Sequence, residues 1–323
     1  MKPNRRDFLA LGVGALAVAT LPRALRRRER LVRRQIPVMG TIAEIAVRHP
    51  DEAWAQRAMD AAFAELRRVD ATMSRFKAES DVGRLNAAAG REGVVVSDDT
   101  AEVLAAGLMW AEASQGRFDP CLGKVCEFWH VESRSAPPSD VEVAAVGRGS
   151  RFRDLEVDRT GSVARAALAS SWAAVDLGGI AKGYGVDLAV RALRDQGIFH
   201  ALVNAGGDLI AMGVDEEGEP WRVGVRSPDH LEQTVEVLRL SDRAVATSGD
   251  YLQFFQYGGR RYSHLMDPIT GEPRRTAMRS LSIEAATCCQ ADAAATALFG
   301  ADRATAELVL GRAAPGSRVA HSV

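Results

Sequence analysis

Apolar residues recur every three or four positions between residues 51 and 73, which predicts a long amphipathic helix. The run just before it reads VMGTIAEIAV and alternates apolar with polar residues, so we expect one strand that leads into this helix. A second helix is predicted after Ser97, because two aspartates follow it in the first turn and Gly116 lies just past the end.

Short apolar runs separated by glycine-containing turns replace this pattern from about residue 173 onward. Such runs, with helices set to the side, predict an α+β fold with antiparallel or mixed sheets. The expected strands lie in ALVNAGGDLIAMGV, EPWRVGVRSP, TVEVLRL, RAVATSGDY, RRYSHLM and SLSIEAAT. The expected helices cover about 179–196 and 290–300, and a further helix begins near Asp302.

The first 34 residues differ in composition from the rest and are typical of a targeting segment. Arg5 and Arg6 precede an apolar run from Phe8 to about Ala19, which is rich in glycine and alanine. This order predicts a twin-arginine export signal, a basic linker up to residue 34 and a periplasmic mature protein. The run is short for a membrane span, but the seven arginines in residues 23–34 leave weak association with the inner membrane as an alternative.

Charge also separates this leader from the body of the chain. Residues 1–34 hold ten Lys and Arg against two acidic residues, which leaves 31 Lys and Arg against 40 Asp and Glu for residues 35–323. An acidic body disfavours nucleic acid as a partner. We expect residues 35–323 to form one main domain, with a surface excursion or a subdomain boundary near 132–150, where serine, proline and charged residues gather.

The four cysteines, Cys121, Cys126, Cys288 and Cys289, lack the spacing of a structural zinc site. An oxidising compartment permits a disulfide between one of the first two and one of the last two. A core of this size does not need such a bond, so buried free thiols are the preferred interpretation.

Two segments combine small residues with groups that suit phosphate and metal ions. The run VDLGGIAKGYGVD, residues 175–187, joins a strand to a helix through glycines, so open backbone amides and Lys182 can meet a phosphate. The run CQADAAATALF places Asp292 and Thr296 four residues apart on one helix face among alanines. A carboxylate and a hydroxyl are hard oxygen donors that suit Mg²⁺. A packing turn and a capped helix start are the structural alternatives.

Polar and aromatic residues near turns are weaker candidates. His264 lies in YSHLMDPITGEP, ahead of a proline-containing turn, and a lone strand histidine is more often structural than catalytic. In SQGRFDPCLG, Phe118 and Asp119 either face a bound ring or fill the core and the turn. The turns in NAGGD and TSGDY are mostly explained as hairpin chemistry.

The order of these motifs resembles the ApbE family of FAD:protein FMN transferases over nearly all of residues 35–323. The matching motifs are MGT (39–41), MSRFKAESDVGRLN (73–86), GRFDP (116–120), VDLGGIAKGYGVD (175–187), NAGGD (204–208), TSGDY (247–251), HLMDPITGEP (264–273) and ADAAATALF (291–299).

The resemblance implies an ApbE-like, T-fold-related α+β fold with FAD in a cleft between two lobes. It implies transfer of FMN from FAD to a threonine hydroxyl of a target protein, with Mg²⁺ on the pyrophosphate and AMP released. By the match, Asp292, Thr296 and the main-chain carbonyl of Gly179 bind Mg²⁺, Lys182 holds phosphate and His264 is the general base. The residues implied to line the flavin and adenine pockets are Met39, Phe76, Arg117, Phe118, Asp119 and Asp176.

One position departs from the family pattern, since tyrosine is common where Phe76 stands, so the ring here can stack but cannot donate a hydrogen bond. The chain shows no convincing copy of the family's acceptor motif, so we expect the acceptor to be another protein, in a respiratory or redox membrane complex. Two rival functions are a metal-dependent FAD pyrophosphatase and a non-catalytic periplasmic flavin-binding maturation protein.

Overall fold

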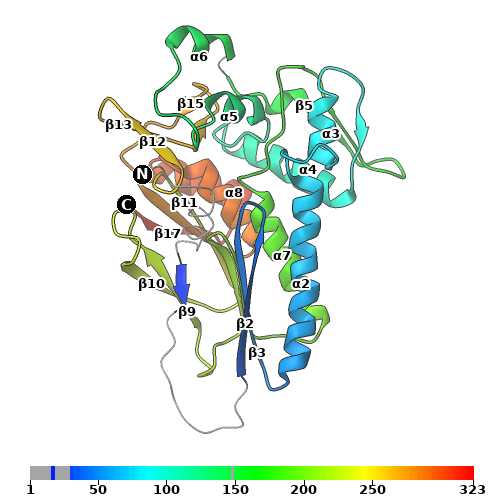
Figure 1. Cartoon of the computed structure of the whole chain (residues 1–323), viewed down its shortest axis with the longest axis vertical. Coiled ribbons are helices and arrows are strands. Elements are labelled where there is room, and N and C mark those ends of the chain that lie inside the picture. The colour runs from blue at the N-terminus through cyan, green and yellow to red at the C-terminus, as the bar shows by residue number, and fades with distance from the viewer. Residues whose placement is uncertain (1–15, 19–29, 147–148) are drawn as a thin grey trace.

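A seven-stranded sheet forms the centre of the protein (Figure 1). The computed structural model describes residues 16–18, 30–146 and 149–323. In spatial order the strands are β17 (Arg318–Ser322), β16 (Ser280–Ala285), β11 (Arg243–Gly249), β8 (Asp208–Met212), β7 (Ala201–Ala205), β3 (Thr41–His49) and β2 (Arg30–Val38). Every neighbouring pair in this sheet is antiparallel, which confirms the predicted α+β class.

Helices cover one face of this sheet and enclose the main core (Figure 1). They are α2 (Glu52–Met73), α7 (Ala181–Asp195) and α8 (Cys288–Leu298), with α9 (Arg303–Ala313) packed next to α8. The apolar stripe of α2 supplies fully buried Met59, Phe63 and Leu66. Because α7 packs against both α2 and α8, it lies in the middle of this helical layer.

The other face of the sheet packs on a smaller sheet. Its strands are β1 (Leu16–Val18), β9 (Trp221–Arg226) and β10 (Thr234–Leu240), in the order β1-β9-β10. Trp221 and Val223 of β9 are buried in a second core with Leu202 of β7 and Leu209 of β8. The central sheet is therefore buried on both faces, which explains why β7 and β8 are fully buried runs.

The chain between α2 and α7 gathers at one end of the molecule (Figure 1). Its elements are α3 (Asp81–Ala87), β4 (Val94–Val95), α4 (Asp98–Ala113), α5 (Gly123–Trp129), α6 (Asp140–Val146), a 3₁₀ turn (Phe152–Asp154), β5 (Leu155–Asp158) and β6 (Arg165–Leu168). Two hairpins from the later chain lie there too: β12 (Phe254–Tyr257) with β13 (Arg260–Ser263), and β14 (Met266–Asp267) with β15 (Glu272–Pro273). The segment 132–150 holds α6, whose Val143 is buried with Trp129 and Phe255.

The predicted helices are confirmed, and their N-caps are the expected polar residues. Asp51 accepts a hydrogen bond from the Trp54 amide, Ser97 caps α4 and Asp302 caps α9. The structure corrects two predicted strands. VMGTIAEIAV is not one strand, because a turn at Met39 and Gly40, both with positive φ, separates β2 from β3.

The second correction concerns RRYSHLM, which is two strands and not one. Its first part, β13, pairs with β12, and its second part, β14, pairs with β15. His264 lies between β13 and β14, where the chain leaves the first hairpin and enters the second. The predicted turn after it is confirmed, since the Asp267 carboxylate accepts a hydrogen bond from the Ile269 amide at 2.8 Å.

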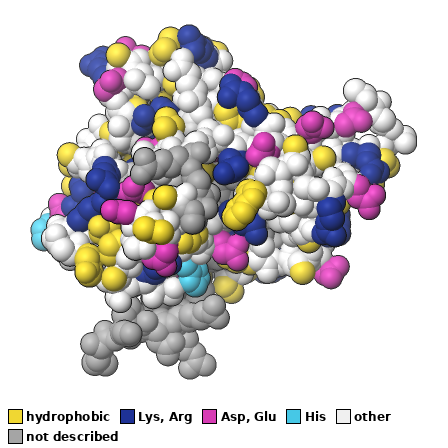
Figure 2. Space-filling view, turned by 90° about the horizontal axis from the view of Figure 1, so that it is seen from above, with side chains coloured by type: hydrophobic (Ala, Val, Ile, Leu, Met, Phe, Trp, Pro, Cys, Tyr) yellow, Lys and Arg dark blue, Asp and Glu magenta, His cyan; other side chains and the backbone are white. Residues whose placement is uncertain are grey.

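Most of the predicted export signal lies outside the described residues. Of that segment, Leu16–Val18 pair with β9, and β2 begins at Arg30, inside the stretch that we predicted as linker. Of the helices in the described ranges, none has the length and apolar character that a membrane span needs. On the face seen in Figure 2, Lys and Arg are interspersed with Asp and Glu, so that face carries charge of both signs.

The core under α2 gives a first prediction. Leu66→Ala leaves a cavity beside α7, and we expect the free energy of unfolding to fall by about 2–5 kcal/mol. Urea unfolding followed by circular dichroism measures it. Leu308→Ala on α9 is the control, because Leu308 is 51% exposed and its loss changes stability by about 0.5 kcal/mol or less. Equal losses in the two variants would contradict this description of the core.

Candidate functional site: the junction of α7 and α8

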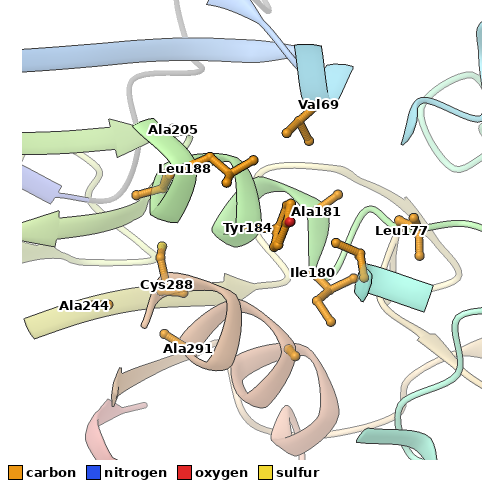
Figure 3. Packing of buried hydrophobic residues seen from close by; sticks show 14 of the residues in the cluster. Val69, Leu177, Ile180, Ala181, Tyr184, Leu188, Ala205, Ala244, Cys288 and Ala291 are labelled. Carbon is orange, nitrogen blue, oxygen red and sulfur yellow. The ribbon is translucent and has the colours of Figure 1, made fainter. Parts of the chain in front are cut away.

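Two glycines let α7 and the turn before it approach α8 very closely. A side chain added at Gly179 would meet the Thr296 hydroxyl at 2.8 Å, and one added at Gly183 would meet the Cys288 carbonyl oxygen at 2.3 Å. Both distances are too short for a real Cβ, so only glycine fits at these positions. Figure 3 shows this packing, with Tyr184 and Leu188 on α7 and Cys288 and Ala291 on α8.

This close approach brings the predicted metal-binding residues to the glycine turn. Thr296 packs against Gly179, and the Asp292 carboxylate accepts a hydrogen bond from the Gly183 amide at 3.0 Å. Asp292 is 4% exposed. The helix face predicted from the four-residue spacing therefore does point at the turn predicted to hold phosphate.

A cluster of three charges lies at the same place. The Lys182 ammonium bonds to Asp208 and is 3.4 Å from a carboxylate oxygen of Asp292. Burial would lower the pKa of Lys182, but Asp208 and Asp292 raise it above the usual value, so the side chain stays charged. Burial and the neighbouring Asp208 charge raise the pKa of Asp292 to about 7. Our expectation that Lys182 holds phosphate stays a prediction; its contacts in the structure are with carboxylates.

The cluster fits a cation. Two buried carboxylates share one ammonium, so with both acids ionised the site carries a net negative charge that burial makes costly. Within the described ranges, no group of three or more His, Cys, Asp or Glu is placed to hold a metal ion. A cation would therefore depend on the Thr296 hydroxyl and a backbone carbonyl besides carboxylate, which is the donor set of Mg²⁺.

His264 lies within electrostatic reach of this cluster. Its amide donates to the Gln253 carbonyl at 3.0 Å, and its ring Nδ1 is 3.4 Å from the same oxygen. A carbonyl oxygen only accepts, so Nδ1 carries the proton and Nε2 is left as an acceptor. Burial lowers the pKa of His264, and the Lys182 charge adds to this, so the ring is neutral at pH 7.

Phe76 has the exposure that a stacking residue needs. Its side chain is 80% exposed, and the Arg75 guanidinium lies over its ring at 4.2 Å. Arg75 is fixed in turn by Asp176, whose carboxylate is 2.8 Å from Nε. Asp176 also accepts from the Gly178 amide at 2.9 Å, so Phe76 is connected to the glycine turn through two side chains.

Arg117 joins its loop to the end of α8. Its guanidinium donates to the carbonyls of Ala297 and Phe299, both at 3.3 Å. Phe118 is 3% exposed and belongs to the main core. The contacts of Arg117 and Phe118 are thus with protein, and their role in nucleotide binding stays a prediction.

Asp119 is also turned toward the protein. Its carboxylate accepts hydrogen bonds from the Ser150 hydroxyl and from the amides of Cys121, Arg151 and Phe152. Burial raises the pKa of this carboxyl, and the four bonds oppose that rise. These contacts match the structural alternative, a turn aspartate, so a nucleotide contact by this side chain is not supported by its surroundings.

Met39 reaches the same helix from the opposite side. It stands in the β2–β3 turn with a φ of 54°, and its sulfur would lie 3.4 Å from a side chain added at Gly185 of α7. The neighbouring Thr41 packs against Gly206 in the β7–β8 turn. The MGT motif therefore joins two turns to α7, while its contact with flavin stays a prediction.

Sequence reasoning missed two parts of the site. We interpreted Asp208 as hairpin chemistry, although its carboxylate completes the charge cluster; the turn at Gly206 and Gly207 gave no sign of this. Arg274 was not singled out, yet it donates to the Phe299 carbonyl at 2.6 Å. Burial, then the nearby Arg117 charge, lowers the pKa of Arg274 to about 10. No local sequence pattern predicts that Arg274 is buried against the end of α8, a helix that follows it in the sequence.

The thiols agree with the preferred interpretation. All four cysteines are free in the structure, and Cys121 and Cys288 are buried. Burial raises the pKa of each of these two thiols well above the usual value, so they are unreactive at neutral pH.

Comparison with known proteins decides the family. The sequence model of the ApbE family matches residues 39–317. The chain belongs to the ApbE family. FAD:protein FMN transferases of Vibrio cholerae and Treponema pallidum are 30% and 33% identical to it, over 81% and 85% of this chain and 79% and 80% of theirs.

Solved structures of the ApbE family share the fold. The ApbE protein of Thermotoga maritima superimposes with a TM-score of 0.79 at 28% identity, covering 90% of this chain and 94% of that one. The flavin transferase ApbE from Vibrio cholerae gives 0.75 at 29% identity, covering 87% and 90%. The ApbE-like fold expected from the motifs is therefore confirmed.

Gly183 and Gly185, both in α7, give a pair of matched predictions. Gly183→Ala forces a methyl group against the Cys288 carbonyl, which cannot move without its helix, and we expect a loss of about 1–3 kcal/mol in stability. Gly185→Ala meets the flexible side chains of Leu66 and Met39 at 3.2 and 3.4 Å and Val69 at an ordinary contact distance of 3.7 Å, and stays within about 1 kcal/mol of wild type. Thermal unfolding compares them. The prediction fails if Gly183→Ala is as stable as Gly185→Ala.

Proposed function

We propose that this protein transfers the FMN part of FAD to a threonine hydroxyl of an acceptor protein and releases AMP. Family membership and the names of the relatives support the reaction class. The observation that carries the proposal is the meeting of Asp292 and Thr296 with the turn at Gly179. This places oxygen donors beside the glycine turn at the start of α7, where a diphosphate would be bound.

We infer that Asp292, Thr296 and the Gly179 carbonyl hold Mg²⁺, as their chemistry and the net negative charge of the cluster favour. When bound, this ion neutralises charge on the diphosphate, which is the main requirement of phosphoryl transfer. Lys182 keeps Asp208 and Asp292 oriented by its ion pairs, and the Gly183 amide fixes one oxygen of Asp292.

His264 is the proposed general base. The acceptor hydroxyl oxygen forms a bond to the FMN phosphorus, the bond from that phosphorus to the bridging oxygen breaks, and AMP leaves with that oxygen. The hydroxyl proton passes to Nε2 of His264, which is neutral because burial and Lys182 lower its pKa. Its backbone and ring contacts with the Gln253 carbonyl restrict rotation of the ring.

The proposed flavin contact is Phe76, supported by its exposure and by the Arg75 stack. Met39, which lies beside Gly185 of α7, and Asp176, which is bonded to the Gly178 amide, would border the bound dinucleotide. We further propose export by the twin-arginine route, on the composition of residues 1–34. On the family resemblance, we propose an acceptor in a redox membrane complex. Mass spectrometry of membrane proteins from strains with and without this protein tests the reaction, because an added FMN on threonine must depend on it.

Asp292→Asn should abolish transfer while the fold survives. Since burial and Asp208 raise the pKa of Asp292 to about 7, the neutral amide resembles a form of the side chain that the folded protein already populates. Loss of the charge removes a strong oxygen ligand, so we expect no detectable FMN on membrane proteins. In-gel flavin fluorescence measures transfer and circular dichroism measures folding. Wild-type levels of transfer would exclude Asp292 as an essential ligand.

His264→Ala should slow transfer by about a hundredfold and leave FAD bound. A base works only when deprotonated, and the lowered pKa of His264 means that transfer by wild type persists below the usual histidine range. We therefore expect the part of the acidic fall in rate that His264 causes to lie below about pH 6.5 and to be lost in the variant, while protonation of Asp292 affects both proteins. Stopped assays at several pH values measure the rate of transfer, and fluorescence titration measures the binding of FAD. Unchanged rate in the variant would refute the assignment.

A further inference from the structure

The first amides of α8 are bound by a side chain of α7. One carboxylate oxygen of Asp187 accepts a hydrogen bond from the Cys288 amide at 2.8 Å, and the other accepts from the Cys289 amide at 2.9 Å. The next amide, that of Gln290, donates to the N-cap Thr287 at 3.2 Å. Amides at a helix start have no partner within their own helix, so α8 depends on two caps, one from Thr287 just before it and one from Asp187 of α7.

Asp187 also follows the four-residue spacing of the site residues Gly179 and Gly183. Gly179, Gly183 and Asp187 are four residues apart along α7 and its leading turn, and Thr296, Asp292 and Cys288 are four apart along α8. They meet in antiparallel order: Gly179 with Thr296, Gly183 with Asp292, and Asp187 with Cys288. Such four-residue ridges are those by which packed helices interlock.

We propose that Asp187 is a positioning residue that fixes the register of α8 against α7, and so holds Asp292 and Thr296 opposite the glycine turn. This proposal rests on the proposed function of the same site. The glycines let the two helices interlock, and the Gly183–Asp292 hydrogen bond joins them in the middle. The Asp187 carboxylate adds two directional hydrogen bonds at the start of α8, and these oppose a slip of one helical turn, which would displace Asp292 by about 5.4 Å.

The alternative is that Asp187 only stabilises the start of α8. Thr287→Ala serves as the matched control, because it removes one hydrogen bond from the same helix end without touching α7. Asp187→Asn keeps one acceptor oxygen and turns an NH₂ group toward the second amide, so it loses one of the two bonds between the helices.

The first readout is amide hydrogen exchange in the protein without ligand. We expect Asp187→Asn to speed exchange about tenfold in peptides from both 288–292 and 181–187, since the Gly183 amide is protected only through Asp292 of α8. Thr287→Ala should speed exchange in 288–292 alone. If both variants affect the same peptides, Asp187 is a cap and the proposal is wrong.

The second readout is binding of Mn²⁺, as a probe for Mg²⁺, in the presence of FAD and without acceptor. We expect about tenfold weaker binding for Asp187→Asn and a change within about twofold for Thr287→Ala. Equal Mn²⁺ affinity in wild type and Asp187→Asn overturns the proposal. If wild type itself binds no Mn²⁺ with FAD, the proposed function fails, and the exchange data still decide the role of Asp187.

Asp187→Glu provides a second test in case Asp187→Asn does not fold. It keeps both acceptor oxygens and the charge, so capping is preserved, but the extra methylene shifts the point at which α8 is held. We expect exchange in 288–292 to stay within about twofold of wild type while Mn²⁺ affinity still falls about tenfold. Full Mn²⁺ affinity in this variant contradicts a register role.

Discussion

The close contact of α7 with α8 is the constraint on which the rest of the structure depends. At Gly183 the two helices are so near that no side chain fits, and the space that a side chain would fill is taken by the Cys288 carbonyl. Asp292 can therefore reach the Gly183 amide, and Lys182 can lie between two acids. The central sheet supports this contact, because α7 rests on β7 and β8 while α8 rests on β8, β11 and β16.

Charged side chains hold α8 at both ends. At its start Asp187 accepts from two amides, and at its end Arg117 and Arg274 donate to the carbonyl of Phe299. Negative charge at a helix start and positive charge at its end both complement the helix dipole. The helix that supplies Asp292 is thus fixed along its axis by groups from three other parts of the chain, which suits the metal-ligand role that we propose for Asp292 and Thr296.

Local patterns predicted most of the fold, because periodicity and caps are properties of neighbouring residues. Asp51 and Ser97 marked helix starts correctly, and the spacing of Asp292 and Thr296 identified a true helix face. The errors arose where the local structure depends on partners that are distant in the sequence. Nothing local shows that β13 and β14 pair with different strands, or that Asp208 meets Lys182. Roles of the pocket residues came from family resemblance, and Asp119 shows how a motif residue can be fully engaged by its own chain.

The hydrogen bond between Gly183 and Asp292 joins residues 109 positions apart, and the intervening chain forms the strands that α8 packs on. Nascent chains that end before β16 therefore contain every residue of the glycine turn and none of its counterpart. Contacts so distant in sequence form late in folding, since the entropy of closing the long loop must first be overcome. The pairing of Gly183 with Asp292 therefore forms only once α8 has been made, and chains that end before α8 lack it.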